Sequence, residues 1–307
     1  MSDPSHIPSA GDPRHTRGRS LAWLAAAYLA SLIGAALTVM ALPGRDPLWV
    51  ALAADAMATV VVFCFSLALD NSSMYDPFWS VAPIPIALYW AMAPGGAEAV
   101  ALRQSLVVIL VAAWGLRLTA NQLVRWHGLG DEDYRYVDIR RKTGRFYWPA
   151  SFVGLHLFPT GWVFLGLLAA WPALSGPGRP PGWLDALGVA VTAGAIALEA
   201  VSDLQLRRFM SSRRERGAML DTGLWGWCRH PNYLGEMGFW WGLWILGFAA
   251  RPAWWTLAGP LSITALFVFI SVPMKDRRML MNHPEWAGRM KQIPAFLPLP
   301  RRASPRR

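Results

Sequence analysis

Five residues able to do chemistry lie within one short stretch, residues 224–241, L-W-G-W-C-R-H-P-N-Y-L-G-E-M-G-F-W-W. They are Arg229, His230, Asn232, Tyr233 and Glu236. Pro231 suits the first turn of a helix, and a helix start offers free N–H groups and a positive dipole end to a phosphate. Arg229 can add a bidentate contact, and Asn232 shares a helix face with Glu236. The pattern predicts an anion-binding helix start; the alternative is a cap that only anchors the helix at the lipid headgroups.

A second polar stretch, E-A-V-S-D-L-Q-L-R-R-F, ends a long apolar run. Glu199, Asp203 and Arg207 recur at every fourth position and so form one stripe on a helix, with Arg208 next to its end. The alternative is a pair of salt bridges within the helix. Because Glu199 lies too deep in the run to be solvated, we interpret the stripe as one wall of a polar cavity.

Arg117, in W-G-L-R-L-T, lies about two turns inside another apolar run. A single arginine within a membrane requires an anionic partner. The candidates are Asp76, Glu199, Asp203, Glu236 or a bound phosphate. The following stretch, residues 125–147, starts at Arg125 and is dense in charged and aromatic residues. We expect most of its charges to belong to a solvated loop.

The sequence N-S-S-M-Y-D-P-F-W places Tyr75 and Asp76 between two apolar runs, directly before Pro77. The alternative is a turn in which Asp76 caps the next helix. A phenol beside a carboxyl group is a common proton-donating combination. We predict that the two side chains form one hydrogen-bonded unit that donates to a ligand.

The composition is that of a polytopic membrane protein: 54% of the 307 residues are hydrophobic and 16% are charged. The chain has eighteen tryptophans, a residue type that is enriched at membrane–water interfaces. The net charge is +10, and the basic residues fall in loops between apolar runs. We therefore interpret the charge as a sign of membrane topology and not of nucleic-acid binding. Histidines are scattered singly, and the two cysteines lie far apart, so no metal site is expected.

An all-α transmembrane bundle of seven to eight spans follows, because a span needs about 20 apolar residues. The candidate spans are 21–42, 48–70, 77–93, 101–122, 151–172, 184–205, 235–250 and 254–273. Pro83 and Pro85 should kink the third. With eight spans, 24 of the 29 basic residues fall on one side, which predicts that both termini are cytoplasmic. We expect a disordered tail (1–20), a single transmembrane domain (21–300) and a basic tail (301–307).

The polar stretches predict a large anionic cofactor, since all three lie on the same predicted side. No G-x-G-x-x-G follows a strand pattern, so a Rossmann unit does not hold it. The apolar and aromatic interior suits a flat, lipophilic substrate.

At these residues the chain resembles the steroid 5-alpha-reductase family, in particular its bacterial membrane branch. The resemblance covers about residues 48–300. It rests on N-S-S-M-Y-D-P-F-W, W-G-L-R-L, E-D-Y-R-Y, S-D-x-x-L-R-R, G-L-W-G-W-C-R-H-P-N-Y-L-G-E and the C-terminal H-P-E-W…I-P-A-F-L-P. The motif R-H-P-N-Y alone is less specific, because membrane methyltransferases of the isoprenylcysteine carboxyl type carry a similar one.

The resemblance implies NADPH-dependent reduction of the 4,5 carbon–carbon double bond of a 3-oxo-4-ene steroid by an integral protein of the bacterial inner membrane. It implies cofactor binding by Arg117, Asp203, Arg207, Asn232, Tyr233 and Glu236, with Arg229 and His230 adjacent; from the polar stretches we add Arg125, Glu199 and Arg208. Asp76 matches the family's catalytic glutamate, and Met74, Trp79 and Trp114 should contact the substrate. Trp114 stands where the family has a tyrosine, so we assign that role to Tyr75.

Two other functions remain open. A membrane methyltransferase would use S-adenosylmethionine, which lacks phosphates and does not need so many arginines. A non-enzymatic lipid-binding or scaffold protein would leave Asp76, Glu199 and Arg117 unexplained.

Overall fold

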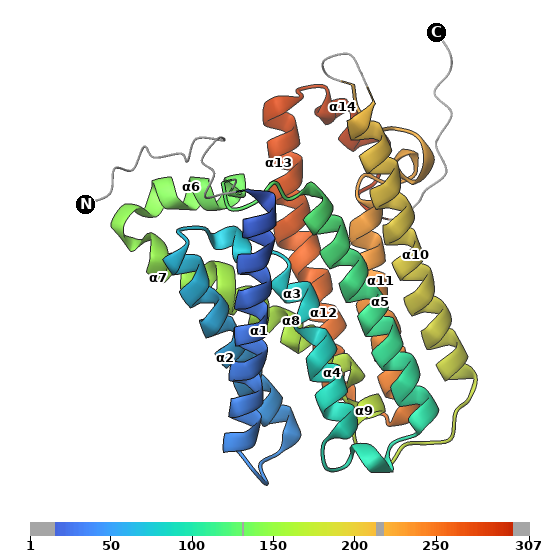
Figure 1. Ribbon diagram of the computed structural model, residues 1–307. Helices are drawn as coiled ribbons and strands as arrows, with labels where there is room; N and C mark the ends of the chain where they lie inside the picture. Colours follow the sequence, from blue (N-terminus) through green and yellow to red (C-terminus); the bar gives the residue numbers. More distant parts are fainter. Residues whose placement is uncertain (1–15, 131, 213–217, 297–307) are drawn as a thin grey trace. The chain divides into compact units, whose positions relative to one another are not determined.

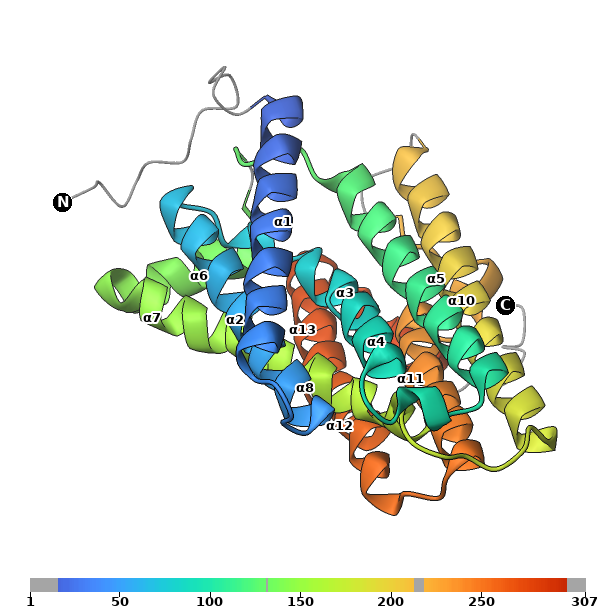
Figure 2. The same ribbon diagram turned by 60° about the horizontal axis from the view of Figure 1, so that its bottom comes forward.

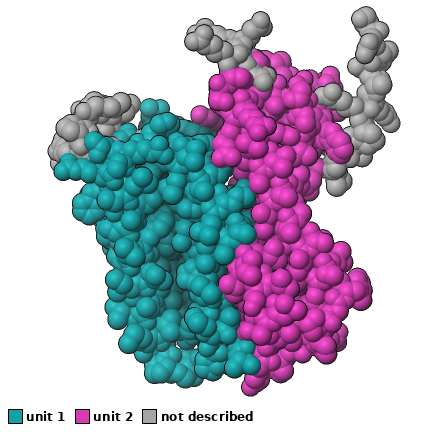
Figure 3. Space-filling view, turned by 45° about the vertical axis from the view of Figure 1, so that its right-hand side comes forward, with its two compact units in different colours: residues 1–97, 111–164 teal, residues 98–110, 165–307 magenta. Residues whose placement is uncertain are grey.

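The computed structural model describes residues 16–130, 132–212 and 218–296. All the regular secondary structure of the described residues is helical. It divides into two compact units, coloured separately in Figure 3. Unit 1 comprises residues 1–97 and 111–164, and unit 2 comprises residues 98–110 and 165–307. Helix α5 (Ala101–Arg125) therefore begins in unit 2 and ends in unit 1.

Unit 1 begins with an antiparallel helix pair, α1 (Arg17–Ala41) and α2 (Pro47–Ala68), which lie side by side in both views (Figure 1, Figure 2). Asp46 caps α2 by accepting a hydrogen bond from the Leu48 backbone N–H at 2.8 Å. Helix α1 starts at Arg17, four residues before the predicted span, so residues 17–20 are not part of a disordered tail. The earlier start is held by contacts within unit 1: the Ser20 hydroxyl accepts from the Leu129 N–H.

After α2, the chain forms three short helices, η2 (Ser72–Tyr75), α3 (Phe78–Val81) and α4 (Pro83–Met92). The predicted third span is therefore divided at Ala82, immediately before the first of its two internal prolines, although the Ala82 backbone itself keeps helical angles (φ −54°, ψ −38°). Proline removes a backbone donor, which explains the break there. A turn, η3 (Gly96–Glu98), leads into α5.

The stretch predicted as a solvated loop is largely helical. It contains α6 (Tyr134–Thr143), capped by Asp133, then η4 (Gly144–Phe146) and α7 (Tyr147–Ser151). A π-helix, η5 (Phe152–Leu157), and α8 (Phe158–Leu167) continue the run. Charged residues did not prevent helix formation, because an N-cap and packing of the buried Tyr136 stabilise α6.

Unit 2 is built around α10 (Trp183–Ser211) and α11 (Pro231–Ala250), which pack along their length. Gly242 permits the close approach, since a Cβ atom there would lie 2.7 Å from the Thr192 backbone nitrogen. The remaining elements are η6 (Leu168–Ala170), α9 (Trp171–Leu174), η7 (Gly223–Gly226), η8 (Trp254–Leu257), α12 (Ala258–Leu266), η9 (Phe267–Ser271), α13 (Val272–Asn282) and α14 (Trp286–Gln292).

Six helical runs of the described chain are long and apolar enough to cross a membrane, so this is an integral membrane protein of the all-α class. They match six of the eight predicted spans. The other two, 77–93 and 235–250, fall on the broken α3–α4 segment and on α11, and neither meets the same length and hydropathy requirements. The predicted basic tail, residues 301–307, lies outside the described residues.

Candidate functional site

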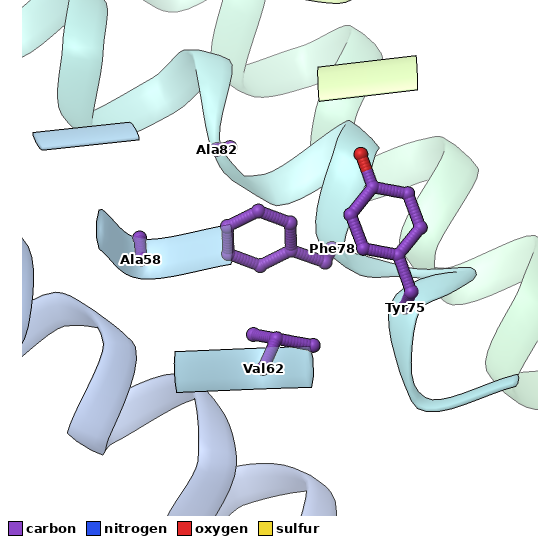
Figure 4. Close-up of a cluster of buried hydrophobic side chains, with 5 residues drawn as sticks. All are labelled: Ala58, Val62, Tyr75, Phe78 and Ala82. Carbon is purple, nitrogen blue, oxygen red and sulfur yellow. The ribbon is translucent and has the colours of Figure 1, made fainter. Parts of the chain in front are cut away.

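Tyr75 is completely enclosed by unit 1, at 2% exposure. Its ring packs against Phe78 with centroids 5.5 Å apart, and Phe78 in turn packs against α2 (Figure 4). The Tyr75 hydroxyl lies 2.7 Å from the Thr160 hydroxyl, which also lies 2.8 Å from that of Thr59. Burial raises the pKa of Tyr75 well above its usual range, so the phenol keeps its proton.

Asp76 lies at the end of η2, with 25% of its side chain exposed. The hydroxyl of Tyr136, on α6, donates a hydrogen bond to its carboxylate, and the Arg135 guanidinium lies 3.9 Å away. Burial raises the pKa of Asp76 to about 6, although Tyr136 and Arg135 oppose the shift. This carboxyl group therefore stays protonated up to about pH 6, closer to neutral pH than an ordinary aspartate does.

The predicted hydrogen-bonded unit of Tyr75 and Asp76 is wrong in its geometry. Tyr75 pairs with Thr160 and Asp76 pairs with Tyr136, so the two neighbours turn to different partners. The cause is the tight 3₁₀ turn of η2, in which the Asp76 N–H bonds to the Ser73 carbonyl. Adjacent side chains on a helical turn do not face each other.

A chain of polar side chains runs beside this pair in unit 1. The Tyr147 hydroxyl lies 3.2 Å from Glu132 and 2.6 Å from the Ser72 hydroxyl, which lies 3.0 Å from that of Ser151. The ring of His156, in the π-helix η5, lies between the Ser151 carbonyl (3.0 Å) and the Ser66 hydroxyl (3.2 Å). π-Helical turns are frequent at functional sites, and the His156 ring packs 5.0 Å from that of Tyr75.

The three residues expected to contact substrate are all in unit 1. Met74 and Trp114 are fully buried. Trp79 is half-buried and packs edge-to-face on Trp114, with centroids 6.0 Å apart. Met74 belongs to a separate cluster with Leu24 and Leu129, so the three residues do not form one surface.

In unit 2, Arg229 and His230 bind a carboxylate of the protein itself. Arg229 Nη2 lies 2.9 Å from Oδ2 of Asp276, on α13, and Nη1 donates to the Met290 and Ile293 carbonyls. His230 Nε2 lies 3.2 Å from Oδ1 of Asp276. Both residues are buried at 7% and 6% exposure. Their polar groups therefore hold α13 and the segment after α14 to the start of α11.

The other predicted residues of α11 lie on its first two turns. Asn232 and Tyr233 are half-buried, and the Tyr233 ring stacks on that of His230 at 5.3 Å. Glu236 is buried and accepts a hydrogen bond from the Trp240 Nε1 at 3.0 Å. No side chain caps α11 within the described residues. An uncapped helix start leaves donors for an anion.

The α10 stripe is polar and buried at its inner end and basic at its outer end. Glu199 and Asp203 are buried at 2% and 9% exposure, whereas Arg207 and Arg208 are exposed. Gly235 allows α11 to approach the stripe, because a Cβ there would lie 2.5 Å from Glu199 Cγ. Unit 2 thus brings the stripe beside the start of α11.

Arg117 and Arg125 belong to unit 1, where Arg117 is half-buried and Arg125 is exposed. The other nine predicted cofactor residues belong to unit 2. In the described ranges, no group of three or more His, Cys, Asp or Glu side chains is close enough to hold a metal ion.

Sequence reasoning missed Tyr136, Thr160 and Asp276 as partners of the predicted residues. Each lies 46 to 85 residues from its partner, and no local pattern marks such pairs. It also passed over Asp55, a lone acid within an apolar span, although that signal was present in the sequence.

Comparison with known proteins places this chain among membrane proteins of unassigned activity. Residues 62–288 match the family described as "Protein of unknown function (DUF1295)". The chain is 24% identical, over 78% of its length and 76% of the relative's, to the uncharacterized protein C594.04c of Schizosaccharomyces pombe. It is also similar to the lamin-B receptor of Drosophila melanogaster, at 32% identity over 27% of this chain and 11% of that protein. No solved structure matches.

Proposed function

This chain belongs to the DUF1295 family of proteins of unknown function, and within it we propose an NADPH-dependent membrane reductase. The proposed reaction saturates the 4,5 carbon–carbon double bond of a 3-oxo-4-ene steroid or a similar flat enone. The observation that carries the proposal is the Asp76 carboxyl group. It accepts a hydrogen bond from the Tyr136 hydroxyl, burial raises its pKa to about 6, and only Pro77 separates it from the aromatic pair Phe78 and Trp79.

The proposed role of Asp76 follows from the charge that an enone reduction creates. Negative charge grows on the ketone oxygen, and a donor aimed at that oxygen stabilises it. In our proposal Asp76 donates to the ketone, and Tyr136 positions and polarises the carboxyl group. Tyr75 is the second proposed donor, and its contact with Thr160 orients its hydroxyl.

The donor set of unit 2 fits the phosphates and amide of a dinucleotide. Bound NADPH would supply the hydride that the β-carbon of the enone accepts. Exposed Arg207 and Arg208 at the end of α10 can meet phosphate charge, while Asn232, Tyr233 and the buried Asp203 and Glu236 offer polar contacts near the uncapped start of α11. Arg229 is a weaker candidate, because two of its nitrogens already bind protein atoms.

We further propose eight spans, with both termini cytoplasmic, in a bacterial inner membrane. The six long apolar helices and the basic residues clustered between them support this topology.

The decisive experiment combines binding and turnover on purified protein in detergent. NADPH is titrated by the fluorescence of its nicotinamide, with S-adenosylmethionine as the comparison ligand, and reduction of progesterone is followed by chromatography. Asp76→Asn and Tyr75→Phe should keep NADPH affinity and lose on the order of 100–1000-fold in rate. Asp138→Asn, an exposed acid on α6, is the matched control.

The other outcomes point elsewhere. Binding of S-adenosylmethionine in place of NADPH supports a methyltransferase, and binding of neither supports a non-enzymatic role. Normal turnover by Asp76→Asn would move the proton donor to another acid, with Glu199 and Glu236 the next candidates.

A further inference from the structure

An apolar groove of about 950 Å³ lies within unit 1, between α1, α2 and the α3–α4 segment. This volume is that of a site for a lipid-sized ligand. Leu29 and Met40 of α1 and Met92 of α4 line it and are themselves 62%, 75% and 78% exposed. In a helix that crosses a membrane, such exposed apolar side chains face the acyl chains. The groove is therefore accessible to molecules dissolved in the bilayer.

One carboxyl group interrupts the apolar lining. Asp55 lies on α2, roughly 13–14 Å along the helix from Asp46, and is 5% exposed. Within the described part of the chain, no side chain or backbone group forms a hydrogen bond or an ion pair with its carboxyl group. The nearby hydroxyls of α1 are engaged elsewhere: that of Tyr28 donates to the Met74 carbonyl and that of Ser31 to the Tyr28 carbonyl.

An unpartnered acid at this depth requires an explanation, because burying a polar group without a hydrogen bond is costly. Ionisable residues inside a span are rare and usually mark a functional site. Thr59, one turn later, donates to the Asp55 backbone carbonyl, which leaves the carboxyl group untouched. A ligand in the groove would supply the missing partner.

The groove is separate from the residues proposed to contact the enone. Met74, Trp79 and Trp114 are not part of its lining. The two regions share one wall, because Phe78 lines the groove and also packs on Tyr75 (Figure 4). A molecule in the groove would thus contact Phe78, whose ring also packs against Tyr75.

The lining indicates the shape of the occupant. Beside larger apolar side chains, six alanines present methyl groups to the groove: Ala51, Ala54 and Ala58 of α2, Ala35 and Ala36 of α1, and Ala82. Small residues on membrane helices allow a rigid neighbour to approach the helix backbone closely. A flat ring system covers such a surface better than a mobile acyl chain.

Asp55 indicates the polar group of the occupant. A hydroxyl both donates and accepts, so it can pair with a carboxyl group in either protonation state. An ammonium would bring a second charge into an apolar site, and a phosphate would be repelled by a carboxylate and belongs at the headgroup level. We propose that the α1–α2–α4 groove binds a flat polycyclic lipid alcohol from the bilayer, whose hydroxyl forms a hydrogen bond with Asp55.

The test uses full-length protein in lipid nanodiscs and a photoreactive diazirine analogue of cholesterol, with labelled peptides mapped by mass spectrometry. Label is expected on α1, α2 and α4. Unlabelled cholesterol should displace it, whereas cholestane, which has the same rings without the hydroxyl, should compete on the order of tenfold less well. Ala36→Phe, which fills the groove, should abolish the label.

Variants at the acid make the test specific. Asp55→Leu should remove the preference for cholesterol over cholestane, and Asp55→Asn should preserve it, because an amide also donates and accepts. Asp46→Asn, the matched acid at the start of the same helix, should behave as the parent protein does. Asp55→Leu should not lower Tm, since replacing an unpartnered buried polar group by an apolar one is neutral or stabilising.

Three results would overturn the proposal. The first is equal displacement by cholestane, which means that any apolar body fills the groove. The second is label spread evenly over the membrane-facing surface. The third is an Asp55→Leu variant that still prefers cholesterol over cholestane, or whose Tm is lowered. Either result would mean that the acid does not bind the hydroxyl and has a structural role instead.

Discussion

Arg229 and Asp276 form a buried ion pair in unit 2, with 2.9 Å between Nη2 and Oδ2. The same carboxylate accepts a hydrogen bond from Trp286 Nε1 at 2.9 Å and lies 3.2 Å from His230 Nε2. The pair joins the start of α11 to α13 and α14. Part of the R-H-P-N-Y motif is thereby explained by assembly of unit 2, without any ligand.

We predict that Asp276→Ala strongly destabilises the protein. Removing one partner of a buried ion pair leaves the other charge uncompensated, at a cost of about 3–5 kcal/mol. The control is Glu285→Ala, whose contact with His283 is largely exposed and should contribute about 0–1 kcal/mol. Thermal unfolding in detergent measures both variants; equal Tm values would contradict the structural role of Asp276.

The proposed reduction should depend on pH through Asp76. Its pKa in the folded protein is raised to about 6 from 3.8, so the proton is lost as pH rises through 6. If Asp76 donates that proton, kcat should fall from pH 5 to pH 8 with a midpoint near 6. Tyr136→Phe should move the midpoint upward, because the Tyr136 hydrogen bond lowers the pKa. The profile of Asp76→Asn should be flat in this range.

The same shift predicts how stability responds to pH. Between pH 4 and pH 6 the folded protein holds a proton that the unfolded chain has released. The contribution of Asp76 is therefore complete below about pH 4 and is lost as pH rises through 6. Urea unfolding at pH 5 and pH 7 should show a smaller difference in Asp76→Asn than in the parent protein.

Cofactor affinity should depend on the polar residues at the end of α10 and the start of α11. Arg207→Ala and Asn232→Ala should each weaken NADPH binding by roughly 1–3 kcal/mol, the scale of a lost charge-assisted or buried hydrogen bond. Arg277→Ala, an exposed arginine on α13, is the control. Calorimetric titration gives the affinities, and unchanged values for both variants would count against the cofactor site in unit 2.

Membrane topology can be tested with reporter fusions in a bacterial host. Fusions after Gly95 and Gly178 should report the periplasmic side, and fusions after Lys142 and Arg307 the cytoplasmic side. The expectation follows from the 24 basic residues that lie on one side of an eight-span layout. A periplasmic signal from the Lys142 fusion would refute that layout.

The sequence by itself determined the class of protein and most of its long helices. Apolar runs of about 20 residues have no alternative to a helix in a membrane, since every backbone group must be satisfied within its own segment. Prolines marked the break at Ala82 for an equally local reason. The polar residues that interrupt these runs were also visible from their neighbours alone.

Only the tertiary structure decided which of those polar residues are engaged. Tyr75 meets Thr160, Asp76 meets Tyr136, and Arg229 meets Asp276, at separations of 85, 60 and 47 residues. Asp55 is visible in the sequence as a lone acid in an apolar run, but only the packing of α1 and α4 around it shows that its carboxyl group lacks a partner among the described residues. Helical periodicity tells which face a side chain occupies, but the neighbour that arrives on that face depends on how distant helices pack, and no local pattern records it.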